Sequence, residues 1–365
     1  MIRKYLRLVL AGAPMALAAG HVHAQSEIPA NLEQAGGIEA LAELAKAEGN
    51  LLVYGAPSQD KFEVWVRDFE QQYGIDVQYY RGPTNTIFQR FVQEQRSGRN
   101  QADIVALSDL TVIETGEEAG YIASYTPQNA ALFPENMRKD AIAYPLFLTV
   151  STVGWNTRVV PEDLQKALFE DPLAALLDPR LKGKIAVVDV TAGGPQLATS
   201  ANLVYNLEDQ YGWEYLEKLA AQDPAIIRTS PVVLDGVIAG DYWATTDAYT
   251  SLFAAQAVNG APIAFQAPDT AAASIFYTSV AENAPNPHAA RLFTEWATSL
   301  EAQNSLAEIT EGDVVIEGWE DRRKVSRFDW YRPASTLYVE WQSDERFRDE
   351  ELRSFYARWA EVYGQ

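Results

Sequence analysis

The sequence predicts an α/β protein of two domains, and three observations lead to this prediction. First, strand-like and helix-like segments alternate over residues 51–120, which is typical of a parallel sheet with right-handed crossovers. Second, an apolar, β-rich segment at 143–160 is too long for one ordinary strand and suits a pair of strands that enter a second domain. Third, a capped amphipathic helix from Asn286 onwards indicates that the chain returns to the first domain.

The first domain is expected to repeat a strand–helix unit three times. Gly55 closes the first strand, and Gly74 ends the helix that follows it. Ser58 stands at the N-cap position of that helix, whose apolar side chains, Phe62 and Trp65 among them, lie on one stripe. The strands are expected at 51–55, 75–80 and 102–107, and the later helices at 87–98 and from Ser108 to Gly120.

The second domain is expected to follow the same plan. Pro161 starts a helical segment, and residues 181–197 repeat the order of strand, glycine turn and helix. The aromatic-rich tail after Gly318 is interpreted as helices packed on the outside of the domains. The remaining segments of the second domain are placed at 225–230, 233–253 and 261–268.

The N-terminal residues have the three parts of a signal peptide. A basic start, MIRKYLR, precedes the apolar run LVLAGAPMALAAG and the small-residue cleavage site Val22-His23-Ala24. We therefore expect residues 1–24 to be removed and the mature chain to begin at Gln25, without the cysteine that a lipoprotein anchor requires. These features predict an exported, periplasmic protein.

The composition limits the chemistry that the chain can perform. It has no cysteine and three histidines, of which His21 and His23 lie in the predicted signal peptide. The remaining histidine, His288, falls in the first turn of a helix and is expected on the surface. Nucleophilic triads and His/Cys metal sites therefore lack their residues. The net charge of −21 disfavours nucleic acid and anionic membranes as partners.

The candidate site lies at the ends of the strands. In an open parallel sheet, ligands bind outside the carboxyl ends of the strands, where helix N-termini favour an anion. Small polar residues follow three strands of the first domain and two of the second, so a binding cleft between the domains is expected. Arg81 and Arg228 are suited to hold a carboxylate or phosphonate, and Trp155 and Tyr249 to cover a small organic ligand. The candidate ligand-binding residues are Tyr54, Ser58, Arg81, Thr84, Asn85, Thr86, Ser108, Trp155, Thr191, Gly193, Gly194, Arg228, Asp247 and Tyr249.

A series of segments along residues 48–310 points to a known family. In chain order they are EGNLLVYGAPS, IDVQYYRGPTNTIFQRF, ADIVALSD, VGWNTRVVP, and GAPIAFQAP followed by AENAPNPHAARLFTEWATS. Taken together, they resemble the periplasmic solute-binding proteins of ABC transporters, in the type II branch that contains the ferric-iron binders. The resemblance implies two α/β lobes, each a mostly parallel sheet flanked by helices, which are joined by two crossing strands.

The same resemblance implies how the chain is divided and what it does. Residues 25–147 and 266–365 would form the first lobe, and residues 148–265 the second. A ligand would be enclosed between the lobes and delivered to an ABC permease in the inner membrane. We expect a monomer that needs no cofactor and has no nucleic-acid partner.

Two classes of ligand stay open. Iron binders of this family hold the metal with two adjacent tyrosines, but the segment TTDAYTS keeps Tyr249 and has Ala248 in the partner position. The turn Ala56-Pro57-Ser58 offers no histidine either, and ferric iron prefers several anionic oxygen ligands. We therefore favour a small organic carboxylate, a phosphonate or a similar oxo-anion. Ferric iron, held through Tyr249, is the alternative.

An enzyme is the competing class of function. A glycosidase needs only two carboxylates, and the chain has 50 acidic residues. However, the turns at the strand ends carry mostly Ser, Thr, Asn and Gly, with Asp109 and Asp247 as their carboxylates. The sequence therefore predicts a binding protein and not an enzyme.

Overall fold

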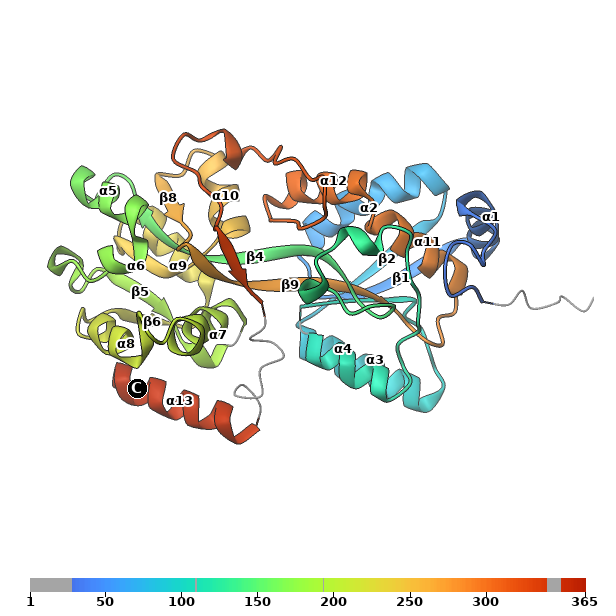
Figure 1. Cartoon of the computed structure of the whole chain (residues 1–365), viewed down its shortest axis with the longest axis horizontal. Helices are drawn as coiled ribbons and strands as arrows, with labels where there is room; N and C mark the ends of the chain where they lie inside the picture. The colour runs from blue at the N-terminus through green and yellow to red at the C-terminus, as the bar shows by residue number, and fades with distance from the viewer. Residues whose placement is uncertain (1–27, 109, 193, 340–348) are drawn as a thin grey trace, which may run out of the picture.

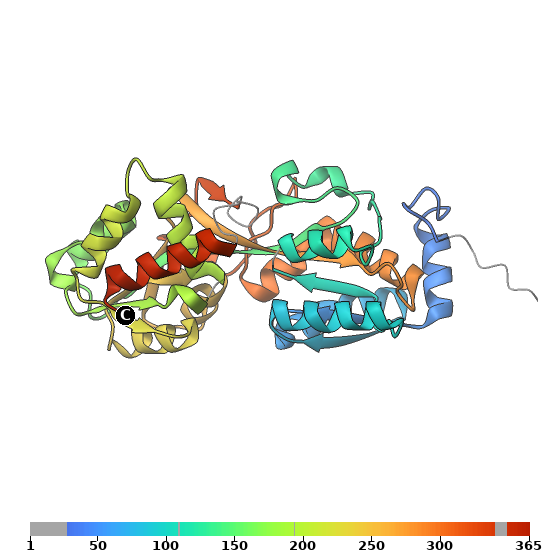
Figure 2. The same ribbon diagram turned by 90° about the horizontal axis from the view of Figure 1, so that it is seen from below.

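A computed structural model describes residues 28–108, 110–192, 194–339 and 349–365 of the chain. The predicted signal peptide at residues 1–24 lies outside the described residues. Two lobes lie at opposite ends of the long axis, and extended strands run from one to the other (Figures 1 and 2). Among the described residues, no helix combines the length and apolar content that a membrane crossing requires.

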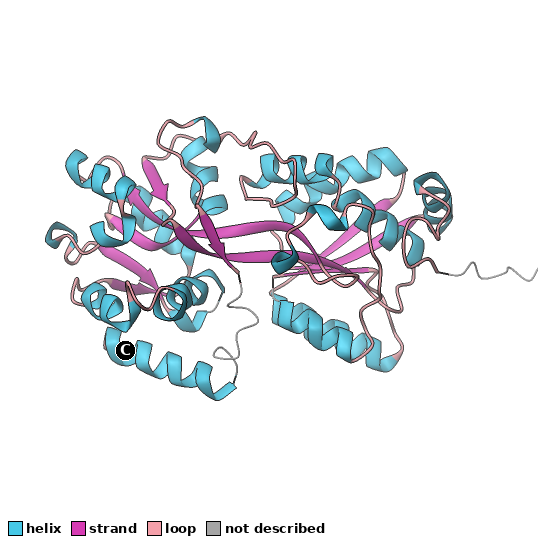
Figure 3. Cartoon of the chain, in the orientation of Figure 1, coloured by secondary structure: helices cyan, strands magenta, loops and turns pink. Residues whose placement is uncertain are grey.

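The first lobe contains the predicted parallel sheet. Its strands are β1 (Asn50–Gly55), β2 (Asp76–Arg81) and β3 (Ile104–Leu107), and the central β1 pairs in parallel with both neighbours. Helices flank this sheet, which confirms the predicted α/β class (Figure 3). The helices of the lobe are α1 (Ile38–Glu48), α2 (Gln59–Tyr73), α3 (Thr84–Ser97), α4 (Leu110–Glu118), α11 (Pro287–Ala297) and α12 (Leu300–Thr310).

The apolar stripe on α2 explains how the first lobe holds its returning helices. Trp65 is fully buried, its ring lies 4.5 Å from that of Trp296 on α11, and its Nε1 donates to the Ala302 carbonyl of α12 at 2.8 Å. Burial of large aromatic side chains contributes strongly to a core. One stripe of α2 therefore joins segments that are more than 200 residues apart in the sequence.

His288, in the first turn of α11, is buried, so the prediction of a surface position is wrong. The side chain is 7% exposed, and its Nδ1 lies 2.7 Å from Oε1 of Glu48 on α1. The Glu48 carboxylate also accepts hydrogen bonds from the backbone N–H groups of His288 and Ala289. A carboxylate from another helix thus caps α11, so a polar residue in a first helical turn is buried here.

Two long antiparallel strands connect the lobes. Strand β4 (Tyr144–Asn156) pairs with β9 (Thr270–Val280) up to Val150, and from Ser151 onwards it pairs with a strand of the second lobe. The prediction of two strands at 143–160 is wrong, because this segment forms one strand of 13 residues, followed by a turn. The second connecting strand is β9, which comes from a much later segment of the chain than β4.

The second lobe has the same strand–helix order on a mixed sheet. Strand β5 (Ile185–Val188) pairs in parallel with β6 (Ala225–Ile227) and β7 (Ala244–Tyr249), and β4 separates β7 from the antiparallel β8 (Ile263–Gln266). The helices of this lobe are α5 (Glu162–Glu170), α6 (Pro172–Ala175), α7 (Gly194–Ala201), α8 (Gly212–Ala220), α9 (Ser230–Ala239) and α10 (Thr250–Val258).

The C-terminal segment does not belong to the first lobe alone, as the sequence analysis assigned it. Strand β10 (Thr336–Tyr338) pairs with the beginning of β9, and α13 (Asp349–Tyr363) lies along the second lobe (Figure 2). Phe355 and Trp359 of α13 are at most 2% exposed and pack into the core of that lobe. The apolar stripe of α13 predicted a packed helix but carried no information about its partner.

Candidate binding site

The strand register shows which way the strand ends face. Strand β9 runs from the second lobe into the first. Ile104 at the start of β3 pairs with Val280, and Leu107 at its carboxyl end pairs with Tyr277, which lies closer to the second lobe. In the second lobe, Tyr249 at the end of β7 pairs with Ser151, where β4 enters that lobe. The carboxyl ends of the parallel strands of both lobes therefore point toward the boundary between the lobes.

A pair of hydroxyl groups marks the strand ends of the first lobe. The Oγ atoms of Thr84 and Ser108 lie 2.9 Å apart, and the backbone N–H of Ser108 points at Thr84 Oγ1 at 3.4 Å. Thr84, Asn85 and Thr86 form the first turn of α3, and the latter two are exposed. Backbone N–H groups in a first helical turn have no partner within the helix. This edge therefore presents hydroxyl and amide donors.

Ser58 and Arg81 lie at the same end of the first sheet. The exposed Ser58 hydroxyl donates to the Asp60 carboxylate, and this bond is the main reason why the pKa of Asp60 is lowered. Arg81 ends β2 opposite Gly55, is exposed, and makes no ion pair with any described residue. Ser58 is thus partly engaged within its own turn, whereas the Arg81 guanidinium is available to a ligand.

Tyr54 is a wrong site prediction. Its side chain is 1% exposed, its hydroxyl donates to Glu94 on α3 at 3.0 Å, and the Arg90 guanidinium stacks 5.0 Å from its ring. Burial, and after it the bond to Glu94, raises the pKa of Tyr54 to about 12. Side chains alternate between the faces of a strand, and Tyr54 falls on the face that α3 covers. It stabilises the lobe and does not reach the strand end.

A second hydroxyl pair lies at the strand ends of the second lobe. The Tyr249 hydroxyl hydrogen-bonds to Ser230 Oγ, which joins the N-cap residue of α10 to the first residue of α9. Tyr249 is half-buried. Arg228 follows β6, is exposed, and has no ion pair among the described residues. Ser230 was not among the predicted site residues, although its position before a proline at a helix start is typical of a strand-end turn.

The turn after β5 is described in part. The Thr191 hydroxyl and its backbone N–H donate to the Asp189 carboxylate at 2.7 and 2.8 Å, and Gly194 is the first residue of α7. Gly193 lies outside the described residues. Asp247 belongs to β7 two positions before Tyr249, and its side chain lies outside the description. Thr191 is exposed at the strand end, where the sequence placed it.

Trp155 is the second wrong site prediction. It is fully buried in the core of the second lobe, 4.7 Å from the ring of Phe169 in an edge-to-face contact. It pairs with Ala244 at the start of β7, which is the end of that strand farther from the boundary between the lobes. An indole at this place cannot cover a ligand that Tyr249 contacts.

At the position where the resemblance to the iron binders implies two adjacent tyrosines, this chain offers one phenol, that of Tyr249. Ala248 is fully buried in the lobe core, and it therefore gives Tyr249 no neighbouring ligand. In the described part of the chain, no group of three or more His, Cys, Asp or Glu side chains is arranged to hold a metal ion.

The family follows from a comparison with known proteins. A model of the bacterial extracellular solute-binding proteins matches residues 51–308, and the chain therefore belongs to this family. The family resemblance predicted from the ordered segments is confirmed at this level.

Three solved structures have the same fold. The substrate-binding protein of an ABC transporter from Agrobacterium tumefaciens is 20% identical, with a TM-score of 0.67 over 88% of this chain and 97% of its own. Iron-bound HitA from Pseudomonas aeruginosa is 14% identical, with a TM-score of 0.66 over 87% and 99%. AfuA from Actinobacillus pleuropneumoniae, with fructose-6-phosphate bound, is 18% identical, with a TM-score of 0.63 over 87% and 99%. At these identities, the likeness concerns the fold alone.

Proposed function

We propose that this chain is the periplasmic solute-binding component of an ABC importer. In this proposal it captures a small anionic solute, an organic carboxylate, a phosphonate or a similar oxo-anion, between its lobes and delivers it to the permease. Membership of the solute-binding family supports the transport role. The predicted signal peptide supports the periplasmic location, and we expect the protein to act as a monomer without enzymatic activity.

The main support for an anionic ligand is that the same chemistry occurs at the strand ends of both lobes. Each lobe presents a hydrogen-bonded hydroxyl pair beside helix N-termini, Thr84 with Ser108 and Ser230 with Tyr249. Each lobe also presents an exposed guanidinium, on Arg81 and Arg228, that pairs with no described carboxylate. These groups are donors or cations, and an oxo-anion offers several acceptors to such a set.

Capture requires that the lobes move together. Strands β4 and β9 are the connections that would bend, and the ligand would contact the strand ends of both lobes only when these approach each other. An anion that binds the closed arrangement more tightly shifts the population toward it by the difference in affinity. The permease would then recognise the closed form, and no covalent step is needed.

Ferric iron is the second candidate, and Tyr249 is the observation that favours it. A phenolate is a strong ligand for this metal, and HitA from Pseudomonas aeruginosa is an iron-bound protein of the same fold. Against iron stands the core position of Ala248, which leaves one tyrosine at this strand end. AfuA, which shares the fold, was solved with a sugar phosphate, so the fold also accommodates an anion.

A ligand screen by thermal unfolding tests the proposal. A ligand that binds only the folded state raises the melting temperature by mass action. We expect phosphonates, phosphate monoesters or small carboxylates to raise it, and ferric citrate to do no more than citrate alone. A protein that turns coloured with iron, or that responds to iron and to no anion, would replace the main proposal with the alternative.

A further inference from the structure

Residues 311–332 form a strap that leaves the end of α12 in the first lobe and reaches the second lobe (Figure 1). The start of the strap is tied to β4, because the backbone groups of Asp313 and Leu148 exchange hydrogen bonds at 2.7 and 3.3 Å. Leu148 belongs to the part of β4 that pairs with β9, before β4 passes to its partners in the second lobe. The start of the strap is therefore anchored on the first-lobe side of the connecting strands.

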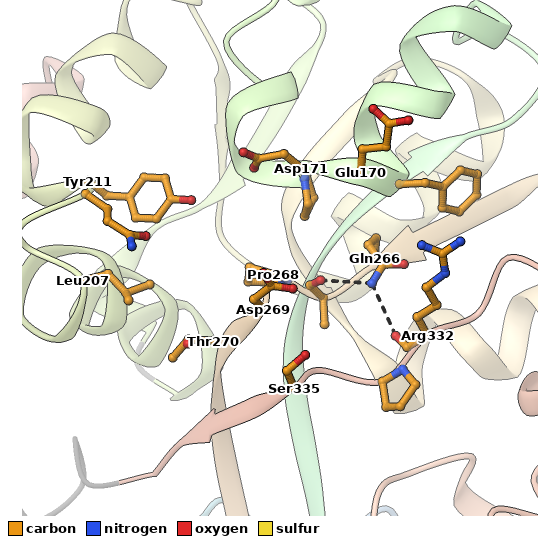
Figure 4. Close-up of a pocket in the computed structure, with 15 residues that line it drawn as sticks. Glu170, Asp171, Leu207, Tyr211, Gln266, Pro268, Asp269, Thr270, Arg332 and Ser335 are labelled. Atoms are coloured by element: carbon orange, nitrogen blue, oxygen red, sulfur yellow. Dashed lines mark hydrogen bonds between the residues drawn. The ribbon is translucent and has the colours of Figure 1, made fainter.

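The rest of the strap is fixed to the second lobe. Val325 is fully buried in a core cluster of that lobe, and the Trp330 ring lies 5.3 Å from that of Phe265 in an edge-to-face contact. Gln266 of β8 donates through Nε2 to the Arg332 carbonyl at 3.4 Å (Figure 4). The strap is therefore a third connection between the lobes, beside β4 and β9.

One side chain of the second lobe meets the anchored start of the strap. Thr250, the first residue of α10, is 3% exposed, and its hydroxyl donates to the Asp313 carboxylate at 2.6 Å. The same hydroxyl oxygen accepts a longer bond, of 3.4 Å, from the Val150 N–H. The Arg323 guanidinium holds the other oxygen of Asp313 at 2.9 Å, which fixes the orientation of the carboxylate. A hydrogen bond to a charged acceptor is stronger than one between neutral groups.

A bend between the lobes would change this contact. Strand β4 changes its partner strand between Val150 and Ser151. Asp313 is anchored before this point, and Thr250 lies beyond it, on a helix of the second lobe. Figure 1 shows the strap and α10 above β4 and β9, and the helices α3 and α7 below them. A movement that brings α3 and α7 together would therefore open the side of the strands on which Thr250 meets Asp313, and a hydrogen bond weakens once its atoms separate beyond about 3.2 Å.

We propose that the bond between Thr250 and Asp313 is a latch, which holds the lobes in the arrangement described and which closure must break. Its role in transport rests on the proposed function: the latch keeps the solute-free protein open, and part of the binding free energy of the solute is needed to release it. Neither residue is a candidate ligand-binding residue, so the latch acts on affinity through the equilibrium between the two arrangements.

The distance between the lobes in the solute-free protein tests the latch. Since the sequence contains no cysteine, Gln93→Cys on α3 and Glu217→Cys on α8 place one spin label on each lobe, both at exposed positions. Electron–electron double resonance then measures the distribution of distances between the labels. We expect Thr250→Val, which replaces the hydroxyl by a methyl group, to enlarge the population at shorter distance at least about threefold over the labelled wild type.

Two further variants separate the latch from a general effect of the substitution. Thr250→Ser keeps the hydroxyl and should restore the wild-type distribution. Thr294→Val is the matched control, because Thr294 is 2% exposed and its hydroxyl donates to the Ala290 carbonyl within α11 at 3.0 Å. It should leave the distribution unchanged.

Thr250→Ala serves as the test variant should Thr250→Val fail to fold, since it removes the same hydroxyl. An unchanged distribution in the folded test variant, a shift to longer distances, or an equal change in Thr294→Val would each overturn the latch. The measurement contains no solute, so its outcome is independent of the class of solute in the proposed function, which the thermal screen tests separately.

Discussion

The buried Arg323 and the exposed arginines at the strand ends differ in how they are paired. Arg323 lies in the segment that follows α12, and its side chain is fully buried. Its guanidinium contacts Asp313 at 2.9 Å, Asp321 at 2.7 Å and the Tyr331 hydroxyl at 2.6 Å. Arg81 and Arg228 are exposed and have no ion pair among the described residues.

This difference separates a structural role from a binding role. Asp313 also accepts a hydrogen bond from Thr250 at the start of α10, so the Arg323 network links the end of α12 in the first lobe to the second lobe. The donors of Arg323 are used within the protein, whereas those of Arg81 and Arg228 have no acidic partner among the described residues and are proposed to bind the solute. Whether an arginine has an ion-pair partner within the ligand-free protein therefore predicts whether its removal affects folding or binding.

Removal of the buried guanidinium should have the largest effect. In Arg323→Met, Asp313 and Asp321 lose their cation, and removing one partner of a buried ion pair costs about 3–5 kcal/mol of unfolding free energy. Urea unfolding measures this loss. Arg322→Met is the control, since Arg322 is exposed and forms a surface ion pair with Glu320, and it should unfold like the wild type. Equal stability of the two variants would remove the contrast between the regions.

Arg228→Gln should show the opposite pattern. The melting temperature of the apo protein should not change, whereas affinity for the anionic solute should fall by about ten- to a hundredfold with loss of a charged donor. Calorimetric titration with the anion found in the screen provides the measurement. Arg158→Gln, at another exposed position of the second lobe, should bind normally. A destabilised Arg228→Gln protein with unchanged affinity would contradict the binding role.

Tyr249→Phe should have a smaller effect that distinguishes the two ligand classes. The variant loses the hydroxyl that bonds to Ser230 but keeps the ring. For an oxo-anion, one neutral hydrogen bond is worth about two- to tenfold in affinity. For ferric iron, loss of the phenolate ligand would abolish binding altogether. A titration with both ligands separates these outcomes, and Tyr242→Phe on the same lobe is the matched control.

The smallest effect concerns Glu295, a buried carboxyl that makes no ion pair with any described residue. Glu295 is 2% exposed, and burial raises its pKa above the ordinary 4.5, although bonds from the Tyr125 hydroxyl and the Gln128 N–H oppose this rise. The folded protein thus holds this proton longer than the unfolded chain does. The stabilisation is complete below pH 4.5 and is lost as the pH rises through the folded pKa.

Glu295→Gln removes this titration. Unfolding free energies of the two proteins, measured from about pH 4 to pH 7, should show the wild type becoming less stable relative to the variant as the pH rises. The expected change is smaller than the effects of the three variants above. A difference that stays constant, or a wild type that gains stability relative to the variant as the pH rises, would show that burial does not govern this carboxyl, in contrast to the fully paired Arg323.

Local patterns were sufficient for the fold of the first lobe. Apolar runs closed by Gly55 and Gly74 predicted β1 and α2, because these signals act within a few residues. The length of β4 and the lobe that receives α13 were not predictable in this way. Both depend on contacts with segments far along the chain, which no local pattern encodes.

The sequence predicted which residues stand at the strand-end turns, and their role in ligand binding stays a prediction. Position after a strand placed Thr84, Ser108 and Tyr249 at the correct edge. Tyr54 and Trp155 were wrong because an aromatic side chain near a strand end packs into the core when its face of the strand is covered.

The most direct test is a crystal structure of protein purified from its cells without refolding, so that a solute carried from the cell is retained. The account predicts an anionic molecule between the lobes, with its oxygen atoms within hydrogen-bond distance of Thr84 or Ser108 on one side and of Ser230 or Tyr249 on the other. A ferric ion bound to Tyr249, or a neutral or cationic solute in this place, would contradict it.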